Sequence, residues 1–314
     1  MDMNTQKIKQ QTLLITGANG LLGQKLVAQA SSNPNFLVIA TGKGTCRLPN
    51  DGLNFHYEQM DVSDPADIAR VFEKYQPEAV IHAASMTDVD RCEIARDTCY
   101  TQNVEATRWV MEACTTHQSH LIYLSTDFIF DGKNGPHDEE AAPNPLNYYG
   151  WTKLETERII QSATCLWSIV RTNLVYGIAH DLSRSNIVLW VKHGLENGKE
   201  LRLVDDQLRT PTLAEDLAYG CLLIAEKRAT GIFNISGKDL LTPYDMALMT
   251  AKHFGLDEAL IIRTDSSQFS QVAKRPLKTG LCIEKARKTL GYEPKSFAEG
   301  IAIVTKQFNL ASTK

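Results

Sequence analysis

Three features that mark other protein classes are missing from this sequence: long hydrophobic runs, an excess of one charge and a framework of closely spaced cysteines. Its longest apolar stretches are of strand length, well short of the ~20 residues that a membrane-spanning helix needs. The 33 Lys and Arg nearly balance the 37 Asp and Glu, so the formal net charge is only −4. We therefore expect neither a membrane nor a nucleic acid as a partner.

The cysteines and the N-terminus bear on the compartment. Seven cysteines are scattered along the 314 residues without a C-x-x-C pair, a pattern that favours neither a disulfide framework nor a zinc site. Residues 1–11 are polar and lack the apolar centre of a secretory signal. We expect a reduced, cytoplasmic protein without a bound metal.

Strand and helix patterns alternate through the first half of the chain. Short apolar runs of β type recur between longer segments with helical spacing, the longest of which covers residues 95–117. This alternation predicts an α/β fold, a doubly wound, Rossmann-type parallel sheet with helices on both faces. The strand-like runs occupy residues 12–17, 36–41, 54–62, 77–85, 120–130 and 167–177.

A glycine turn follows the first strand-like run. The stretch "TGANGLLG" places Gly17, Gly20 and Gly23 between that run and the next helix, with Leu21 and Leu22 opening the helix. Such a turn lets the backbone approach a pyrophosphate, and the helix N-terminus offers free N–H groups. A generic strand–helix turn is the simpler interpretation, but the position after a clean opening strand favours dinucleotide binding.

The end of the second strand-like run bears on which dinucleotide binds. An NAD site places an Asp or Glu there for the ribose 2′-hydroxyl, whereas this sequence has no carboxylate but carries Lys43 and Arg47. Because a cation suits a 2′-phosphate, NADP(H) is preferred and NAD(H) is the alternative. Both side chains can also be read as ordinary loop cations.

Further cofactor contacts are expected after the third and fourth strand-like runs. Asp61 and Val62 end the third, where an adenine edge is expected to lie. The small residues Ala83, Ala84 and Ser85 end the fourth, where bulk would block the cofactor.

A tyrosine and a lysine stand four residues apart in "YYGWTKLETE". In a helix, Tyr149 and Lys153 lie one turn apart on the same face. An exposed aromatic–lysine pair is the plain interpretation. The alternative is a phenol whose proton is controlled by an ammonium group, because a nearby cation stabilises the phenolate. Tyr148 is the rival phenol, but the residue four positions later is Thr152, which carries no charge.

Several motifs together resemble those of one family. The glycine turn of G-x-x-G-x-x-G spacing, a Ser/Thr at the fifth strand and Y-x-x-x-K are similar to the extended short-chain dehydrogenases/reductases. More narrowly, the chain resembles the dTDP-4-dehydrorhamnose reductases from about residue 12 to residue 300. The stretches that carry this resemblance are "ASMTDVDRCE", "STDFIFDG", "YYGWTK", "DQLRTPT" and "AKRPLKT".

The resemblance implies NADPH-dependent reduction of a 4-keto group on a nucleotide-linked deoxysugar. Tyr149 would donate the proton, and Lys153 would lower the pKa of Tyr149 and hold the nicotinamide ribose. Thr126 would donate a hydrogen bond to the substrate carbonyl, with Ser125 beside it. Asn103 would support the lysine, through a water or a backbone contact.

The remaining assignments concern the substrate. Thr87 and Val89 follow the fourth strand, where a loop can meet the sugar, and Arg275 can meet a diphosphate because a guanidinium suits bidentate phosphate contact. Arg171 is expected to be ion-paired beneath the site. Leu174 departs from a tryptophan that contacts the sugar nucleotide in some of these reductases, so the base and the sugar stay open.

We expect two domains. The regular alternation of strands and helices loosens after residue 178. A dinucleotide-binding domain is predicted over residues 10–180, completed by residues 212–236. Residues 181–211 and 237–314 are predicted to form a smaller, C-terminal substrate-binding domain.

Two other functions compete with the reductase. A regulatory subunit of methionine adenosyltransferase has the same fold and similar motifs, and it acts mainly as a binding partner. A sugar-nucleotide epimerase or dehydratase is the other alternative. A dehydratase is expected to carry an Asp–Glu pair after its catalytic Thr, whereas here Asp127 is followed by Phe128. Besides a nucleotide-sugar substrate, a homodimer stays open as a partner.

Overall fold

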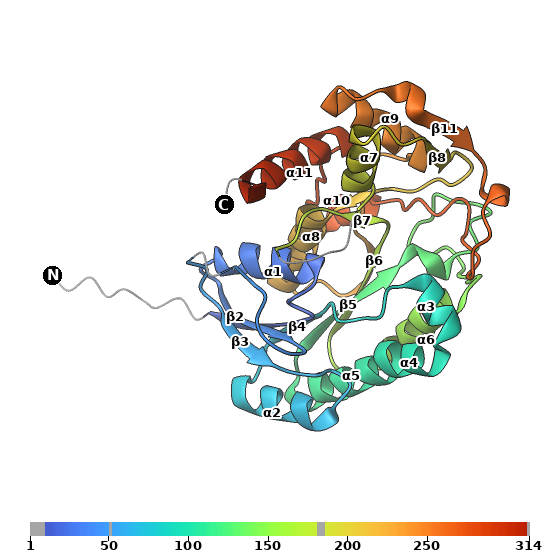
Figure 1. Ribbon diagram of the computed structural model, residues 1–314. Coiled ribbons are helices and arrows are strands. Elements are labelled where there is room, and N and C mark those ends of the chain that lie inside the picture. The colour runs from blue at the N-terminus through green and yellow to red at the C-terminus, as the bar shows by residue number, and fades with distance from the viewer. Residues whose placement is uncertain (1–9, 50–51, 181–185, 313–314) are drawn as a thin grey trace.

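Seven parallel strands form a central sheet in the computed structural model, which describes residues 10–49, 52–180 and 186–312 (Figure 1). Their order is β10-β6-β5-β4-β1-β2-β3. The direction of winding therefore reverses between β1 and β4, and in open sheets of this kind ligands bind at such a switch point. The strands are β1 (Gln11–Thr16), β2 (Phe36–Gly42), β3 (His56–Gln59), β4 (Ala79–His82), β5 (His120–Thr126), β6 (Trp167–Thr172) and β10 (Gly231–Asn234).

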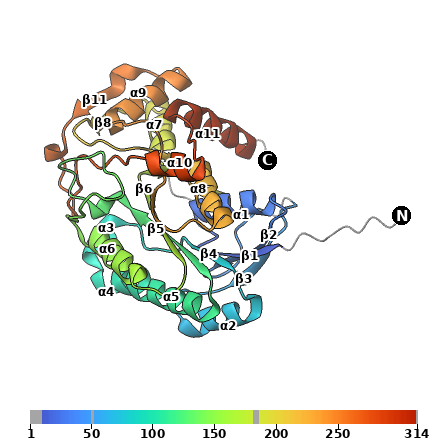
Figure 2. The same cartoon turned by 180° about the vertical axis from the view of Figure 1, so that it is seen from behind.

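Helices cover both faces of this sheet, which confirms the predicted doubly wound fold. Figures 1 and 2 show α1, α8 and α10 on one side and α2, α5 and α6 on the other. Alternate residues of β1 pack against the helices on the two faces of the sheet, because successive side chains of a strand point to opposite faces. Leu13 and Ile15 pack with α1 and α8, whereas Leu14 packs with α2 and α5. The bounds are α1 (Leu21–Ser31), α2 (Pro65–Tyr75), α5 (Ala106–His117), α6 (Tyr148–Gln161), α8 (Ala214–Lys227) and α10 (Glu284–Leu290).

The burial of these apolar side chains supplies the main driving force for this architecture. Leu13, Leu14 and Ile15 are each fully buried, and burying such a side chain contributes about 1.5–3 kcal/mol. Helix α8 and strand β10 come from residues 212–236 and join the sheet layers. The domain boundaries themselves stay a prediction.

The segment predicted as one helix over residues 95–117 contains a change of helix type. It is built from α4 (Arg96–Tyr100), a π-helical turn (Thr101–Glu105) and α5, and α3 (Val89–Ile94) precedes it. Short π-helical turns inside α-helices are frequent at functional sites.

The later part of the chain builds a smaller layer above the carboxyl ends of the strands (Figure 1). Its strands pair as β7 with β9 and β8 with β11. Among the described residues, no helix is both long and apolar enough to cross a membrane. The elements of this layer are β7 (Val175–Tyr176), α7 (Ile187–Glu196), β8 (Leu201–Val204), β9 (Thr212–Leu213), α9 (Pro243–Phe254), β11 (Ile261–Thr264) and α11 (Phe297–Ser312).

Candidate active site

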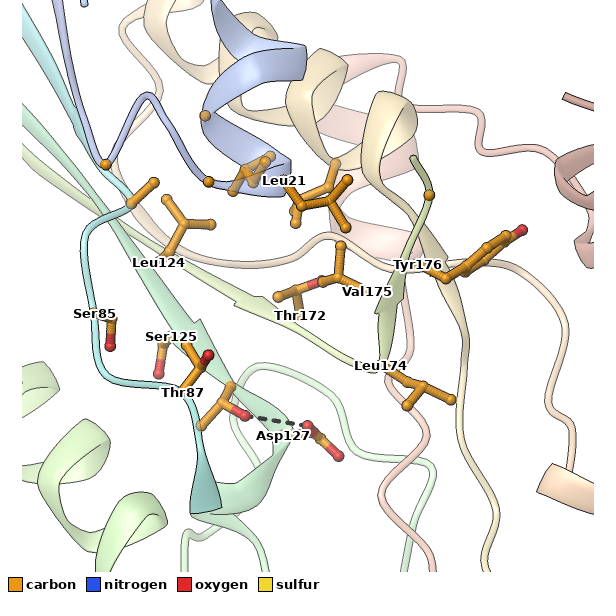
Figure 3. A pocket seen from close by; sticks show the side chains of 18 of the residues that line it. Leu21, Ser85, Thr87, Leu124, Ser125, Asp127, Thr172, Leu174, Val175 and Tyr176 are labelled. Atoms are coloured by element: carbon orange, nitrogen blue, oxygen red, sulfur yellow. Dashed lines mark hydrogen bonds between the residues drawn. The ribbon is translucent and has the colours of Figure 1, made fainter. Parts of the chain in front are cut away.

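A cavity of about 810 Å³ lies at the carboxyl ends of β1, β4, β5 and β6 (Figure 3). A second hollow of about 300 Å³ adjoins it at the ends of β2 and β3. Gly17, Gly20, Ala83 and Ser85 line both, so the two hollows form one trough across the switch point of the sheet. A trough at the switch point of such a sheet suits a dinucleotide.

The trough brings together nearly all residues predicted for the site. Every predicted cofactor residue lines one or both hollows, and so does every predicted substrate residue except Arg275. The larger cavity is lined by Gly17, Gly20, Leu21, Leu22, Gly23, Ala83, Ser85, Thr87, Val89, Ser125, Thr126, Tyr149 and Lys153. The smaller one adds Lys43, Asp61, Val62 and Ala84. The roles of these residues stay predictions.

The glycine turn lines both hollows of the trough through Gly17 and Gly20. Gly17 has a φ of +68°, and a Cβ there would stand 2.8 Å from the backbone nitrogen of Ala84. A Cβ at Gly23 would stand 2.6 Å from the Cα of Ala18, so the start of α1 packs too closely against the turn after β1 for any side chain. Within the described chain, no side chain caps α1 at Gly20 and no acidic residue stands in its first turn. The free N–H groups and positive end of α1 therefore fit a pyrophosphate.

Two cations line the smaller hollow. Lys43 forms an ion pair with Asp61, with 2.7 Å between Nζ and Oδ2. The side chain of Arg47 has no ion-pair partner among the residues that the structure describes, while its backbone N–H donates to Asn19 Oδ1 at 2.8 Å. Of these two cations, Lys43 is paired with a carboxylate and Arg47 has no such partner in the part of the chain that the structure describes.

Helix α6 places the tyrosine and the lysine on the cavity wall. It begins at Tyr148, after Asn147, whose Oδ1 accepts a hydrogen bond from the Gly150 N–H at 2.8 Å. Tyr149 and Lys153 are only 7% and 2% exposed, so the plain interpretation of an exposed pair is excluded. Lys153 Nζ donates to Ser85 Oγ at 3.5 Å.

The surroundings of Tyr149 correct one expectation. Burial raises the pKa of Tyr149 well above its usual range, and a hydrogen bond with Thr126 is the main effect that lowers it. The pKa of Tyr149 in this structure therefore lies above its usual range, against the net lowering expected from Lys153. Burial also lowers the pKa of Lys153 itself, to about 7, against the charge of Glu157. Both shifts have one cause, since an apolar site disfavours the charged form of either group.

Asn103 lies in the π-helical turn and holds the loop after β4. Its Oδ1 accepts hydrogen bonds from the Met86 N–H at 2.8 Å and from the Ser85 hydroxyl at 2.9 Å. Its Nδ2 donates to the Met86 carbonyl at 3.0 Å. Ser85 Oγ also accepts the hydrogen bond from Lys153, so Asn103 is linked to the lysine through the Ser85 side chain. The prediction was a link through a water or a backbone contact.

A buried ion pair lies beneath the site. Arg171 donates to Glu157 from Nε at 3.1 Å and from Nη2 at 2.8 Å, and Ser125 Oγ donates to the same carboxylate at 2.5 Å. This confirms the ion pair predicted for Arg171. Glu157 was missed, although its place four residues after Lys153 puts it on the same face of α6 and was the available signal.

Asp127 was also missed as a member of the cavity wall (Figure 3). Its Oδ1 accepts a hydrogen bond from the Thr126 hydroxyl at 3.2 Å, and its Oδ2 accepts one from Thr279. Burial raises the pKa of Asp127, and the nearby Arg209 acts in the opposite direction. The hydroxyl predicted to meet the substrate is therefore held by a buried carboxyl group.

Arg275 and Leu174 complete the predicted set. Arg275 lies outside the residues that line the trough, and its guanidinium forms a bidentate ion pair with Asp90. Its contact with a diphosphate stays a prediction. Leu174 lines the cavity with a φ of +37°, and an L-residue is held at such an angle only by its surroundings.

Comparisons with known proteins identify the family of this chain. The family model described as "RmlD substrate binding domain" matches residues 11–310. Methionine adenosyltransferase 2 subunit beta of Bos taurus is 32% identical over 254 residues, which are 79% of this chain and 74% of the relative. A dTDP-4-dehydrorhamnose reductase of Aggregatibacter actinomycetemcomitans is 27% identical over 301 residues, which are 92% of this chain and 96% of the relative.

A solved structure shows the same fold. The dTDP-4-dehydrorhamnose reductase of Bacillus anthracis, crystallised in complex with NADP, has a TM-score of 0.81 and 23% identity, covering 95% of this chain and 100% of that one. The resemblance to extended short-chain dehydrogenases/reductases is thus confirmed, and the chain belongs to the RmlD substrate-binding domain family.

Proposed function

We propose that this protein reduces the 4-keto group of a nucleotide-linked deoxysugar with NADPH, as a dTDP-4-dehydrorhamnose reductase does in dTDP-L-rhamnose biosynthesis. The observation that carries the proposal is the buried grouping of Thr126, Tyr149 and Lys153 on the wall of one cavity. The reductase relative from Aggregatibacter, which aligns over 92% of the chain, supports it.

The residues present fit a nicotinamide dinucleotide. The uncapped N-terminus of α1 would hold the pyrophosphate, and Lys153 and Ser85 would face the nicotinamide half. The reductase from Bacillus anthracis, which shares this fold, was crystallised with NADP. When bound, NADPH supplies the hydride that the carbonyl carbon receives.

The protein's own part in the reaction is to supply a proton and stabilise charge. Negative charge develops on the carbonyl oxygen as the carbon is reduced, and it must be neutralised there. Tyr149 is protonated at neutral pH because burial raises its pKa, so it carries the proton that the oxygen needs. The Thr126 hydroxyl, which donates to Asp127 in this structure, would turn to donate to the same oxygen. Protonated Lys153 would stabilise the phenolate that remains.

The function is tested by following NADPH absorbance with a panel of nucleotide-linked 4-keto sugars. Wild type should oxidise NADPH with at least one of them. Tyr149→Phe should lower the rate by ~10²–10⁴-fold, the usual contribution of a general acid, while its affinity for NADPH stays unchanged. Oxidation that persists in Tyr149→Phe would contradict the assigned role.

Cofactor preference is a separate proposal. Arg47 and Lys43 at the end of β2 are proposed to bind a 2′-phosphate, which makes NADPH the preferred cofactor and NADH the alternative. Arg47→Ala and Lys43→Ala should each weaken NADPH binding roughly tenfold, the loss of about one charge-assisted hydrogen bond, and leave NADH binding unchanged. Equal weakening of both cofactors, measured by fluorescence titration, would refute the preference.

A second function has support of its own. The Bos taurus relative is the beta subunit of a methionine adenosyltransferase, so we propose as a second candidate that this chain is a partner of such an enzyme. If no 4-keto sugar is reduced and an adenosyltransferase co-purifies with the chain, a regulatory role replaces the reductase. An epimerase role would be indicated by a tightly held cofactor without net NADPH oxidation. A homodimer and a cytoplasmic location stay predictions.

A further inference from the structure

Two cysteines lie in one buried cluster beneath the candidate active site. Cys92 on α3 and Cys99 on α4 are both fully buried. Cys92 Sγ donates to the Met86 carbonyl at 3.6 Å, and Asn103 Nδ2, which lies 3.4 Å from Cys99 Sγ, donates to the same carbonyl at 3.0 Å. In an unbroken helix, seven residues would set them about 10.5 Å apart along the axis. The helix breaks at Ala95, where φ is −105° and ψ is 62°, and both side chains enter one apolar cluster with Met86 and Tyr149.

Polar contacts connect this thiol pair to the predicted catalytic lysine. Asn103 Nδ2 lies 3.4 Å from Cys99 Sγ, and the Thr152 hydroxyl lies 3.8 Å from it. The Oδ1 atom of the same Asn103 accepts a hydrogen bond from the Ser85 hydroxyl, and Ser85 Oγ in turn accepts a hydrogen bond from Lys153 Nζ. A displacement of the Cys99 sulfur therefore reaches Lys153 through two side chains.

The two thiols differ in reactivity. The neighbouring Cys92 thiol lowers the pKa of Cys99, and the Thr152 hydroxyl and the Lys153 charge act in the same direction against burial. The pKa of Cys92 is raised by the neighbouring Cys99 thiol and by burial. Because the thiolate is the reactive form, oxidation should begin at Cys99.

The cluster also lies directly behind the cavity wall. Val89, Phe128 and Tyr149 pack in the same cluster as the two cysteines and line the cavity as well. A water-sized oxidant that enters the cavity therefore has a short path to the sulfurs. Hydrogen peroxide is an oxidant of this size.

We propose that Cys92 and Cys99 form a modification site, a dithiol that peroxide converts into an intramolecular disulfide. The Cys99 thiolate attacks one peroxide oxygen, which gives a sulfenic acid and releases hydroxide. The Cys92 sulfur then attacks the sulfenic sulfur, and its proton leaves with the sulfenic hydroxyl as water. In total the two thiols lose two electrons and two protons, and one peroxide becomes two waters.

The disulfide changes the site because its sulfurs are bonded at about 2.05 Å, much closer than two thiols in contact. Bond formation moves the Cys99 sulfur away from Asn103. Asn103 then no longer holds the Ser85 side chain, which accepts the hydrogen bond from Lys153. Misplacement of a catalytic group by about 1 Å can cost ~100-fold in rate, so activity should fall by up to that factor. This loss rests on the proposed reductase function, whereas the disulfide does not.

The test is peroxide treatment of the full chain, read by peptide mapping and intact mass. The expected result is a Cys92–Cys99 cross-linked peptide, a loss of two hydrogens and a parallel fall in NADPH oxidation, all reversed by dithiothreitol. Cys46→Ser, which removes an exposed thiol, should behave as wild type. Cys92→Ser should leave a sulfenic acid at Cys99 that dimedone labels.

The outcomes separate the two proposals. The dithiol is overturned if Cys46 is oxidised and no cross-linked peptide appears, a result that needs no variant to fold and no reductase activity. The link to the site is overturned if the disulfide forms while both NADPH affinity and turnover stay unchanged. If the chain reduces no 4-keto sugar, NADPH affinity is the remaining measure of whether the disulfide affects the site. Formation of the disulfide should then weaken NADPH binding.

Discussion

At the scale of single residues, burial has more influence on the site than the charge pattern seen in the sequence. The spacing of Tyr149 and Lys153 placed them on one helix face, as the structure has them. Whether Lys153 lowers the pKa of Tyr149 depends on desolvation, because burial opposes the charged form of each group. The depth of burial depends on β4, β5 and the π-helical turn, and no local sequence window contains that information.

The ionisation of Lys153 leads to a pH prediction. Its pKa is lowered to about 7 by burial, so the ammonium is present below that pH and is lost as pH rises through it. We expect kcat/KM, which reports the free enzyme, to fall above about pH 7. Lys153→Met should abolish this limb of the profile along with most activity. A wild-type profile that stays flat to high pH would contradict a functional ammonium.

At the scale of elements, the glycine turn was predictable and the buried ion pair was not. Gly17, Gly20 and Gly23 stand in one short stretch after an apolar strand. The structure places Gly17 and Gly20 in the turn and Gly23 in the first turn of α1. The Arg171–Glu157 pair joins β6 to α6 and depends on how these two elements pack. The sequence indicated that Arg171 would be ion-paired, but only the structure identifies Glu157 as its partner.

Two glycines of this turn should respond differently to a methyl group. Gly23→Ala would force the new Cβ against Ala18, and overpacking of this kind costs about 1–3 kcal/mol. Gly20→Ala meets only the Gly17 carbonyl oxygen at 3.3 Å, so its stability should change little while NADPH binding weakens at the helix N-terminus. Thermal unfolding and NADPH titration of both variants would check this. Equal losses of stability would contradict the packing argument.

At the scale of the whole molecule, the predicted parallel sheet was confirmed because most of its strands are buried, largely apolar runs, with the polar edge strand β3 as the exception. The connection between distant segments was not predictable. Residues 273–279 cross from the smaller layer to α3, where Arg275 meets Asp90, 185 positions earlier in the chain. Neither charge identifies its partner in the sequence, so a diphosphate was an equally plausible target for the guanidinium.

A double-mutant cycle distinguishes these two roles of Arg275. If the ion pair is its main role, Arg275→Ala and Asp90→Ala should raise the KM for the sugar nucleotide to a similar extent. The double variant should then add nothing further. The loss of stability should be small, up to ~1 kcal/mol, because the pair is partly exposed. A much larger rise in KM for Arg275→Ala alone would instead assign it to the diphosphate.

The central claim is that this cavity transfers a hydride to a nucleotide-linked 4-keto sugar and protonates the oxygen through Tyr149. The most direct measurement is a reaction with NADPH deuterated at the transferred position, followed by mass and NMR analysis of the sugar. We expect deuterium at C4 of the sugar with wild type and almost none with Tyr149→Phe. Product without deuterium at C4, or no product from any 4-keto sugar, would contradict it.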